Sequence, residues 1–185
     1  MEAVLSKEIV INKTLSRALG VLVFVVLTSL GAFVRIPLPF TPVPLTLQTF
    51  FVLLSGALLG GSLGVTAQLS YILLGVLGLP IFTGAGSGLL YLSGPTAGYL
   101  FGFVLACLFC AKFIKYSGNN FSKAFGIFCV ADFLLLASGT LWLKFLFGYS
   151  LTKLFSIGFI PFVLGDLCKA AAAAVVYIKL RPRLK

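Results

Sequence analysis

Long apolar stretches separated by short breaks set the pattern of this chain. Six stretches approach or exceed the length of about 20 residues that a helix needs to cross a bilayer. They cover residues 15–34, 45–59, 63–79, 95–113, 122–147 and 160–180. The second and third are short and contain glycines, which permit close packing between helices. The pattern therefore predicts six transmembrane helices.

The breaks between these stretches are rich in proline and glycine. Residues 37–44 contain four prolines, which forbid a helix and favour a stiff extended loop. Gly60 and Gly61 separate the second stretch from the third. Glycines recur through residues 80–94, which we expect to form a loop or a re-entrant turn. Pro95 then occupies a favoured position for the first turn of the fourth helix.

The composition supports a membrane protein and excludes a soluble enzyme. Hydrophobic residues make up 60% of the 185 positions and charged residues only 10%, against about 25% in soluble domains. The mean hydropathy is +1.15. We therefore expect an all-α integral membrane protein, a single domain over residues 1–185. It comprises a cytoplasmic tail at 1–14, a compact six-helix bundle at 15–180 and a basic tail at 181–185.

The basic residues predict the orientation of the bundle. Six spans place both termini on one side, and ten of the 14 Lys and Arg residues fall in segments on that side. Three fall on the other side and one lies within the last helix. Because cytoplasmic segments carry an excess of Lys and Arg, we expect both termini in the cytoplasm of a multi-pass protein of the cell membrane. The net charge of +10 is thus attributed to topology and anionic lipid, not to nucleic acid.

Several kinds of chemistry have no residues to perform them. The chain contains no histidine, which excludes imidazole catalysis and histidine-bound metals. It contains no P-loop and no recognisable pair of nucleophile and base. Cys107 and Cys110 lie in an apolar stretch, so we interpret them as packing residues and not as a redox motif. We predict no enzymatic activity, no catalytic residue, no metal and no cofactor.

Two charged residues in the last apolar stretch are the main candidates for function. An ionisable side chain at the centre of a span costs about 2.5–3.5 kcal/mol or more. Asp166 and Lys169 are three residues apart and therefore share one helical face. One interpretation is an internal salt bridge that stabilises packing. The other is a polar ligand site, because a carboxylate and an ammonium suit a small ligand that has both N–H and C=O groups.

Other polar residues in the apolar stretches leave more alternatives open. Gln48 lies near the proline-rich loop, and Gln68 shares a helical face with Tyr71. For Gln68 and Tyr71, hydrogen bonding to a neighbouring helix is at least as good an interpretation as ligand binding. Asp132 lies near mid-depth in the fifth helix. It could line the cavity, pair with a lysine such as Lys123 or Lys144, or meet a partner subunit.

Four motifs follow one another along the chain in a characteristic order. They are Pro42-Val-Pro-Leu-Thr-Leu-Gln48, Tyr71-x-x-x-Gly75-x-x-Gly78-x-Pro80-x-Phe82, Gly94-Pro-Thr-Ala-Gly-Tyr-Leu100 with Gly102-Phe103, and Gly165-Asp-x-x-Lys169. Together they resemble the BioY family, the biotin-binding S components of energy-coupling factor (ECF) transporters. The resemblance implies a six-helix subunit that captures biotin on the outer side of the membrane. It also implies two kinds of partner, a transmembrane coupling subunit and two ATP-binding cassette (ABC) ATPases.

The resemblance also implies which residues bind the ligand. Asp166 would accept from the ureido N–H groups of biotin, and Lys169 would donate to the ureido oxygen or to the carboxylate. Further candidates come from the first loop, the fourth helix and the glycine-rich loop, which would close over the bicyclic ring. They are Gln48, Tyr99, Thr83, Gly86, Ser87 and Tyr91. Phe82, Leu89 and Tyr91 would cover the apolar parts of the ligand.

Two other functions remain alternatives at this point. A self-sufficient secondary transporter for biotin or a similar vitamin could use Asp132 as a proton-coupling carboxylate. A structural membrane protein without a small ligand is the third hypothesis. Uptake without any coupling subunit would favour the secondary transporter. A ligand screen in which no ligand raises the thermal stability would favour the structural protein.

Overall fold

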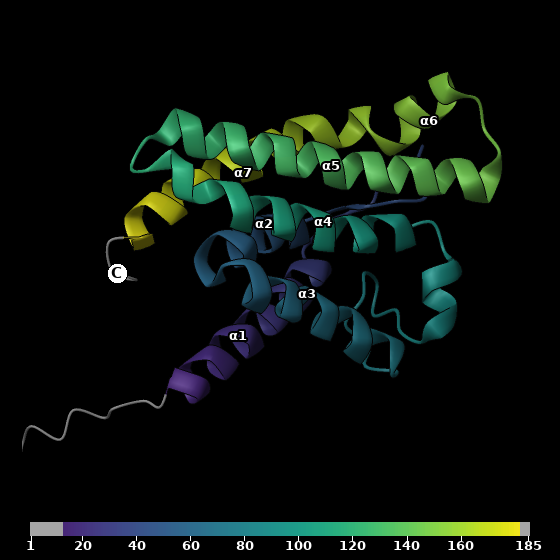
Figure 1. Ribbon diagram of the computed structural model, residues 1–185. Helices are drawn as coiled ribbons and strands as arrows, with labels where there is room; N and C mark the ends of the chain where they lie inside the picture. The colour runs from purple at the N-terminus through teal and green to yellow at the C-terminus, as the bar shows by residue number, and fades with distance from the viewer. Residues whose placement is uncertain (1–12, 182–185) are drawn as a thin grey trace, which may run out of the picture.

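The computed structural model describes residues 13–181, so the tails predicted at 1–14 and 181–185 lie almost wholly outside the described residues. The described part is helical, with one short hairpin (Figure 1). Its seven α-helices are α1 (Lys13–Phe33), α2 (Gln48–Leu59), α3 (Gly61–Val76), α4 (Ala97–Phe113), α5 (Phe121–Phe147), α6 (Leu151–Gly158) and α7 (Ile160–Leu180). Two 3-10 helices, η1 (Leu89–Ser93) and η2 (Ile114–Ser117), and strands β1 (Arg35–Ile36) and β2 (Leu45–Thr46) complete it.

Four helical stretches within residues 13–181 are long and apolar enough to cross a membrane. They are Lys13–Phe33, Ala97–Ser117, Phe121–Phe147 and Leu151–Leu180. Helices α2 and α3 are apolar but shorter, as the sequence predicted. The expected count of six spans is met if α6 and α7 together form the last one.

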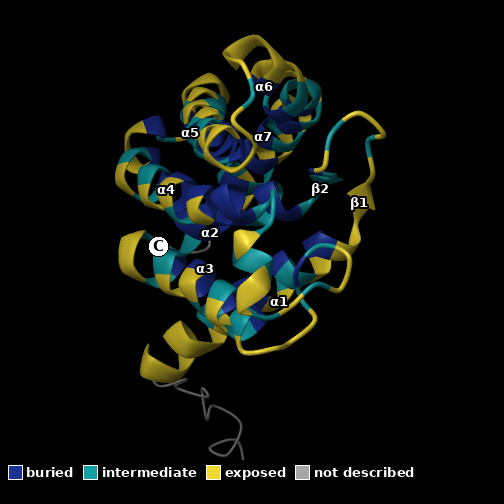
Figure 2. Ribbon diagram, turned by 90° about the vertical axis from the view of Figure 1, so that its right-hand side faces the viewer, coloured by how far each residue is buried: buried dark blue, intermediate teal, exposed yellow. Residues whose placement is uncertain are grey.

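Helix α2 lies at the centre of the bundle, in contact with α1, α3, α4 and α7. Helix α5 packs against α4 on one side and against α6 and α7 on the other. Figure 2 shows the result: buried residues gather on α2, α4 and the inner face of α7, and exposed residues cover the outside. Val52 and Leu53 on α2 have no exposed surface, although the helix is only 12 residues long.

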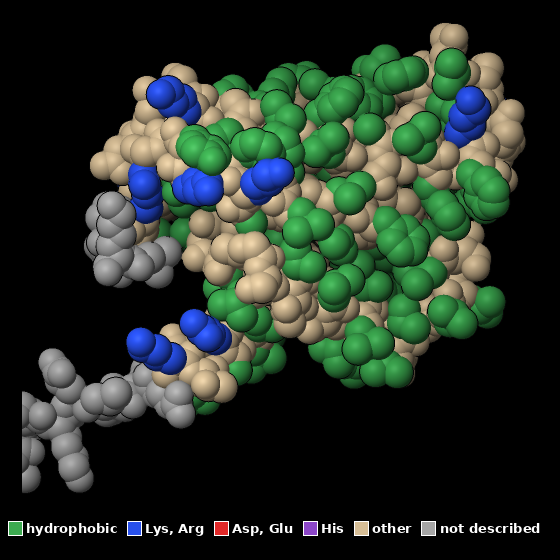
Figure 3. Space-filling model, in the orientation of Figure 1, with side chains coloured by type: hydrophobic (Ala, Val, Ile, Leu, Met, Phe, Trp, Pro, Cys, Tyr) green, Lys and Arg blue, Asp and Glu red, His purple; other side chains and the backbone are tan. Residues whose placement is uncertain are grey.

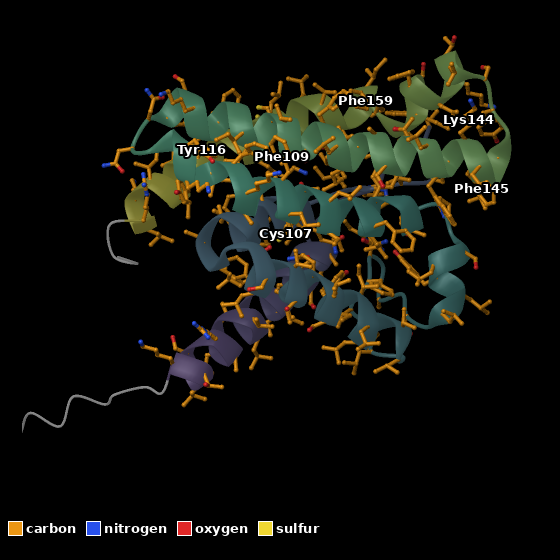
Figure 4. The ribbon with its side chains drawn as sticks, in the orientation of Figure 1. Cys107, Phe109, Tyr116, Lys144, Phe145 and Phe159 are labelled. Atoms are coloured by element: carbon orange, nitrogen blue, oxygen red, sulfur yellow. The ribbon has the colours of Figure 1, made fainter. Side chains whose placement is uncertain are left out.

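Two glycines allow the inner helices to approach one another closely. A Cβ atom at Gly56 of α2 would overlap the backbone oxygen of Cys107 on α4. A Cβ atom at Gly102 of α4 would lie 2.9 Å from the backbone oxygen of Leu135 on α5. The contacts meet backbone atoms, which cannot rotate away as a side chain can. Cys107 lies inside the bundle (Figure 4), and Cys110 is also buried, which confirms their interpretation as packing residues.

Some of the predicted boundaries were wrong. The second helix begins at Gln48 and not at residue 45, because Leu45 and Thr46 pair with Arg35 and Ile36 in an antiparallel hairpin around the prolines. The third helix ends at Val76, and the fourth begins at Ala97, two residues after Pro95. Helix α6 was not predicted. The loop at 80–94 is partly ordered by the 3-10 helix η1.

The basic residues lie mostly at one end of the molecule, which we call the basic end. It holds the start of α1, helix η2 and the end of α7 (Figures 1 and 3). The opposite end, the loop end, holds residues 77–96 and the turn between α5 and α6. Figure 4 places Tyr116 toward the basic end, and Lys144 and Phe145 at the loop end. The two ends of the described chain therefore lie on the same side of the bundle.

Candidate ligand-binding site

A cavity lies between α2, α4, α5 and α7, under the hairpin and the loop at residues 77–96. Its empty volume is about 490 Å³, including its open mouth. The apolar part of its lining comes from Val43, Pro44, Leu45, Leu100, Phe103, Leu135, Leu136 and Phe162.

The polar side of the cavity is formed around Asp166 and Lys169. They lie one turn apart on α7 and form an ion pair, as their spacing predicted. Asp166 is 3% exposed, and Lys169 is 11% exposed at its side chain. Thr49 of α2 donates a 3.3 Å hydrogen bond to Oδ1 of Asp166. Lys169 Nζ donates a 2.9 Å bond to the backbone oxygen of Thr46 in β2.

In this arrangement Asp166 and Lys169 face the cavity and are not completely surrounded by protein atoms. Both Asp166 and Lys169 line the cavity. An ammonium has three N–H donors, and two of those on Lys169 are directed at Asp166 and Thr46. One donor therefore remains for a ligand, beside a carboxylate that can accept. The geometry favours a ligand that offers a donor and an acceptor close together.

Gln48, at the start of α2, connects the first loop, α3 and the glycine-rich loop. Its Nε2 donates a 2.6 Å bond to the Tyr71 hydroxyl, which in turn donates to the Ile81 carbonyl at 3.1 Å. Its Oε1 accepts from the hydroxyls of Thr83 at 3.1 Å and Thr46 at 3.3 Å. Gln48 lines the cavity, but its amide is already engaged on both sides by protein groups.

Gln68 lies outside the cavity and is used between helices. Its Nε2 donates to Ser55 at 2.9 Å and to Thr28 at 3.5 Å. Its Oε1 is buried and has no hydrogen-bond partner in the described part of the chain. Tyr71 is buried under the loop and bonds to Gln48, so both side chains have the interhelical role that the sequence offered as an alternative.

The glycine-rich loop is held together by stacked aromatic rings. The rings of Phe82 and Tyr91 stack with their centroids 4.6 Å apart. Gly86 leaves the space that the Tyr91 ring occupies, since a Cβ there would overlap the ring. The Tyr91 hydroxyl donates to the Thr83 backbone oxygen at 3.3 Å. Thr83 and Tyr91 line the cavity. Gly86 does not line it but packs against the Tyr91 ring.

Of the remaining candidates, some line the cavity and others do not. Tyr99 lines the cavity, and its hydroxyl donates a 2.7 Å bond to the Gly158 carbonyl at the end of α6. Ser87 is exposed and is not part of the cavity lining. Phe82 is fully buried behind the lining, and Leu89 is 70% exposed. The structure thus brings six of the eight predicted site residues to one cavity: Asp166, Lys169, Gln48, Tyr99, Thr83 and Tyr91.

Sequence reasoning missed two polar groups beside the ion pair, the Thr49 hydroxyl and the Thr46 carbonyl. Thr49 follows Gln48 directly, but a threonine in an apolar helix gives no signal of its own. A backbone carbonyl gives none at all. Asp132 was also placed incompletely: among the described residues it forms no ion pair with Lys123 or Lys144, and it lines a second hollow together with Asp166.

A helical membrane bundle that presents a charged pair to an internal cavity defines a class of proteins that bind small polar molecules within the membrane. The family model described as BioY family matches residues 6–185. The chain therefore belongs to the BioY family.

Named relatives and a solved structure agree with this family. "Biotin transporter BioY" of Thermotoga maritima is 38% identical over 159 residues, covering 86% of this chain and 92% of that protein. "Probable biotin transporter BioY" of Lysinibacillus sphaericus is 40% identical over 166 residues, covering 85% and 82%. A crystal structure of the S-component for biotin from an ECF-type ABC transporter matches with a TM-score of 0.84 and 25% identity. The match covers 92% of this chain and 93% of that one.

Proposed function

We propose that this chain is the biotin-binding S component of an ECF-type ABC transporter and that it serves in biotin uptake. The observation that carries the proposal is the Asp166–Lys169 pair, which lines a cavity within an apolar bundle. Membership of the BioY family and the names of the relatives support the choice of biotin among small polar ligands.

The chemistry of biotin matches the two sides of the cavity. Its ureido ring has two N–H donors and one strong C=O acceptor. Asp166 accepts from an N–H group, and Lys169 uses its remaining donor for the ureido oxygen or the carboxylate. The apolar walls, with Phe103, Leu136 and Phe162, cover the thiolane ring and the valeryl chain. Thr83 and Tyr91 lie where the loop meets the ligand.

Orientation and partners belong to the same proposal. The basic end faces the cytoplasm, which places both termini there and the loop end on the outer side of the cell membrane. The chain is a single membrane domain embedded in lipid. A transmembrane coupling subunit and two ABC ATPases complete the transporter, and ATP is hydrolysed by those partners. Family membership supports this assembly.

The site is tested by measuring radiolabelled biotin binding to the purified chain in detergent. Asp166→Asn and Lys169→Ala each remove one charge-assisted interaction, which is expected to weaken binding by about 10- to 100-fold. Lys144→Ala is the matched control, because Lys144 is exposed at the loop end and lies outside the cavity. Unchanged affinity in both site variants would contradict the site, and no binding by the wild type would contradict the function.

Uptake measurements distinguish the S component from a self-sufficient transporter. In a host that lacks every ECF coupling subunit and ATPase, the chain alone is expected to bind biotin without accumulating it. Co-expression of a coupling module restores uptake. Accumulation by the chain alone would favour the secondary transporter.

A further inference from the structure

Asp132 on α5 is a buried carboxyl group that the proposed biotin contacts do not use. It is 5% exposed, and its Oδ1 has no hydrogen-bond partner among the described residues. It does not line the ligand cavity. A carboxylate inside a membrane bundle is expensive unless it is paired or neutral, so its presence requires a physical account.

A second hollow brings Asp132 next to the ligand site. Asp132 and Asp166 both line a hollow between α5 and α7, with an empty volume of about 500 Å³. Asp166 and Leu136 line both this hollow and the ligand cavity. The rest of the lining is apolar apart from the Cys129 thiol: Phe133, Leu136, Phe159, Val163, Leu167 and Ala170. Figure 4 shows Phe159, which lines this hollow, between α6 and α7.

The charges around Asp132 do not balance if every group is ionised. The groups that act on it are Asp166 and Lys169 of α7, the thiol of Cys110 on α4 and the thiol of Cys129 on α5 itself. Two carboxylates and one ammonium carry a net charge of −1, beside an apolar hollow at membrane depth. Two like charges that line one apolar hollow disfavour ionisation of both carboxyl groups, and one bound proton makes the cluster neutral.

The proton belongs on Asp132 because Asp166 has better partners for its negative charge. Asp166 receives the Lys169 ammonium and the Thr49 hydroxyl, both of which stabilise its charged form. Asp132 has neither. A protonated Asp132 also gains a donor, and Asp166 lines the same hollow.

We propose that Asp132 is a positioning residue that stays protonated and donates a hydrogen bond to Asp166. The bond holds the Asp166 carboxyl group oriented toward Lys169 and the ligand cavity. Asp132 thus supports ligand binding through Asp166 without touching the ligand. The part of this proposal that concerns biotin rests on the proposed function, whereas the protonation of Asp132 does not.

Infrared spectroscopy tests the proton directly in the empty protein. The chain has four acidic side chains, Glu2, Glu8, Asp132 and Asp166, so the variant Glu2→Gln/Glu8→Gln retains only the two in question. At neutral pH this protein is expected to show the carbonyl stretch of a protonated side-chain carboxyl group, and adding Asp132→Asn is expected to remove it. Absence of the band before Asp132 is changed would overturn the proposal.

Biotin titration tests the orienting role. Asp132→Asn retains a neutral donor and is expected to bind biotin within about threefold of the wild type, whereas the matched change Asp166→Asn weakens binding by about 10- to 100-fold. Asp132→Leu remains neutral but removes the donor, and its affinity is expected to fall by about tenfold while thermal unfolding still shows a folded protein. Wild-type affinity in Asp132→Leu, or loss of binding in Asp132→Asn, would overturn the role. If the wild type itself binds no biotin, the proposed function fails, and the infrared band still decides the protonation.

Discussion

At the scale of single residues, the polar groups of the site bond to one another. Oδ1 of Asp166 accepts from both Lys169 and Thr49, and Lys169 also reaches the Thr46 carbonyl. These bonds fix the charged pair in one geometry before binding. Preorganisation of this kind reduces the entropy that a ligand loses on binding.

Thr49→Val tests whether the hydroxyl that bonds to Asp166 matters for affinity. Valine keeps the shape of threonine but removes the donor, so Asp166 loses one stabilising bond. A hydrogen bond to a charged group is worth about 1.5–3 kcal/mol, and the expected loss of biotin affinity is about tenfold. Thr66→Val is the matched control, since Thr66 is exposed on α3 and bonds only to the Ser62 carbonyl. Equal affinity in the two variants would contradict the assignment.

Tyr99→Phe separates a stabilising role of Tyr99 from ligand binding. Its hydroxyl donates to Gly158, which also accepts from Thr140 at 3.1 Å, so the carbonyl keeps one partner. We expect a loss of about 1 kcal/mol in the free energy of unfolding. The phenylalanine ring still lines the cavity, so biotin affinity should change by less than about threefold, which corresponds to the loss of no more than one weak contact. Thermal unfolding and titration measure the two effects, and a large affinity loss with unchanged stability would mean that the hydroxyl contacts the ligand.

Sequence reasoning found the residues whose charged side chains cost the most free energy inside a membrane. Asp166 and Lys169 were predictable because charge at membrane depth is rare and their spacing fixes a shared face. The position of Asp132 was predictable, but its neighbours were not, because they lie on another helix and depend on how α5 packs against α7.

At the scale of elements, the contact between α2 and α4 determines the shape of the cavity. Helix α2 supplies Gln48 and Thr49, and α4 supplies Tyr99 and Phe103. Gly56 lets the two helices approach each other because no side chain separates it from the Cys107 backbone. Gly56 is therefore one of the residues that set how closely the two helices approach each other.

Gly56→Ala is expected to disturb both stability and binding. The added methyl group overlaps a backbone oxygen, so the helices must separate, and overpacking of this kind costs about 1–3 kcal/mol or more. Biotin affinity should fall with it because both walls move. Gly126→Ala on α5 is the matched control, since a Cβ there meets nothing within 4 Å. A Gly56→Ala protein as stable as the control would show that α2 and α4 tolerate the separation.

The elements themselves were predictable to different degrees. Long apolar stretches such as those of α1 and α5 were predicted within two residues at either end. The hairpin of β1 and β2 was missed because Leu45 and Thr46 continue an apolar stretch and only their pairing with Arg35 and Ile36 makes them a strand. Helix α6 was missed because it is only eight residues long and follows α5 after a short turn.

At the scale of the whole molecule, the separation of charge gives the bundle an orientation. The basic end carries most of the described Lys and Arg residues, and the loop end carries few (Figure 3). Because anionic lipid and the insertion machinery both favour basic residues on the cytoplasmic side, the cavity mouth should face outward.

Reporter fusions test this orientation. A fluorescent protein that matures only in the cytoplasm is expected to fluoresce when fused after Lys185 and to stay dark when inserted after Gly148, in the turn between α5 and α6. Both fusions carry the same reporter, and immunoblotting controls for expression. The reverse pattern would place the biotin site on the cytoplasmic side in this state and would contradict capture from outside.

The break between α6 and α7 has a consequence for the membrane in which the protein works. Helix α7 has 21 residues, or about 31 Å at 1.5 Å per residue, which matches a hydrocarbon core of about 30 Å. The eight residues of α6 are joined to it at a corner and need not cross the bilayer. The length of α7 therefore determines how deep Asp166 and Lys169 lie, and a thinner or thicker bilayer would change the tilt of this helix.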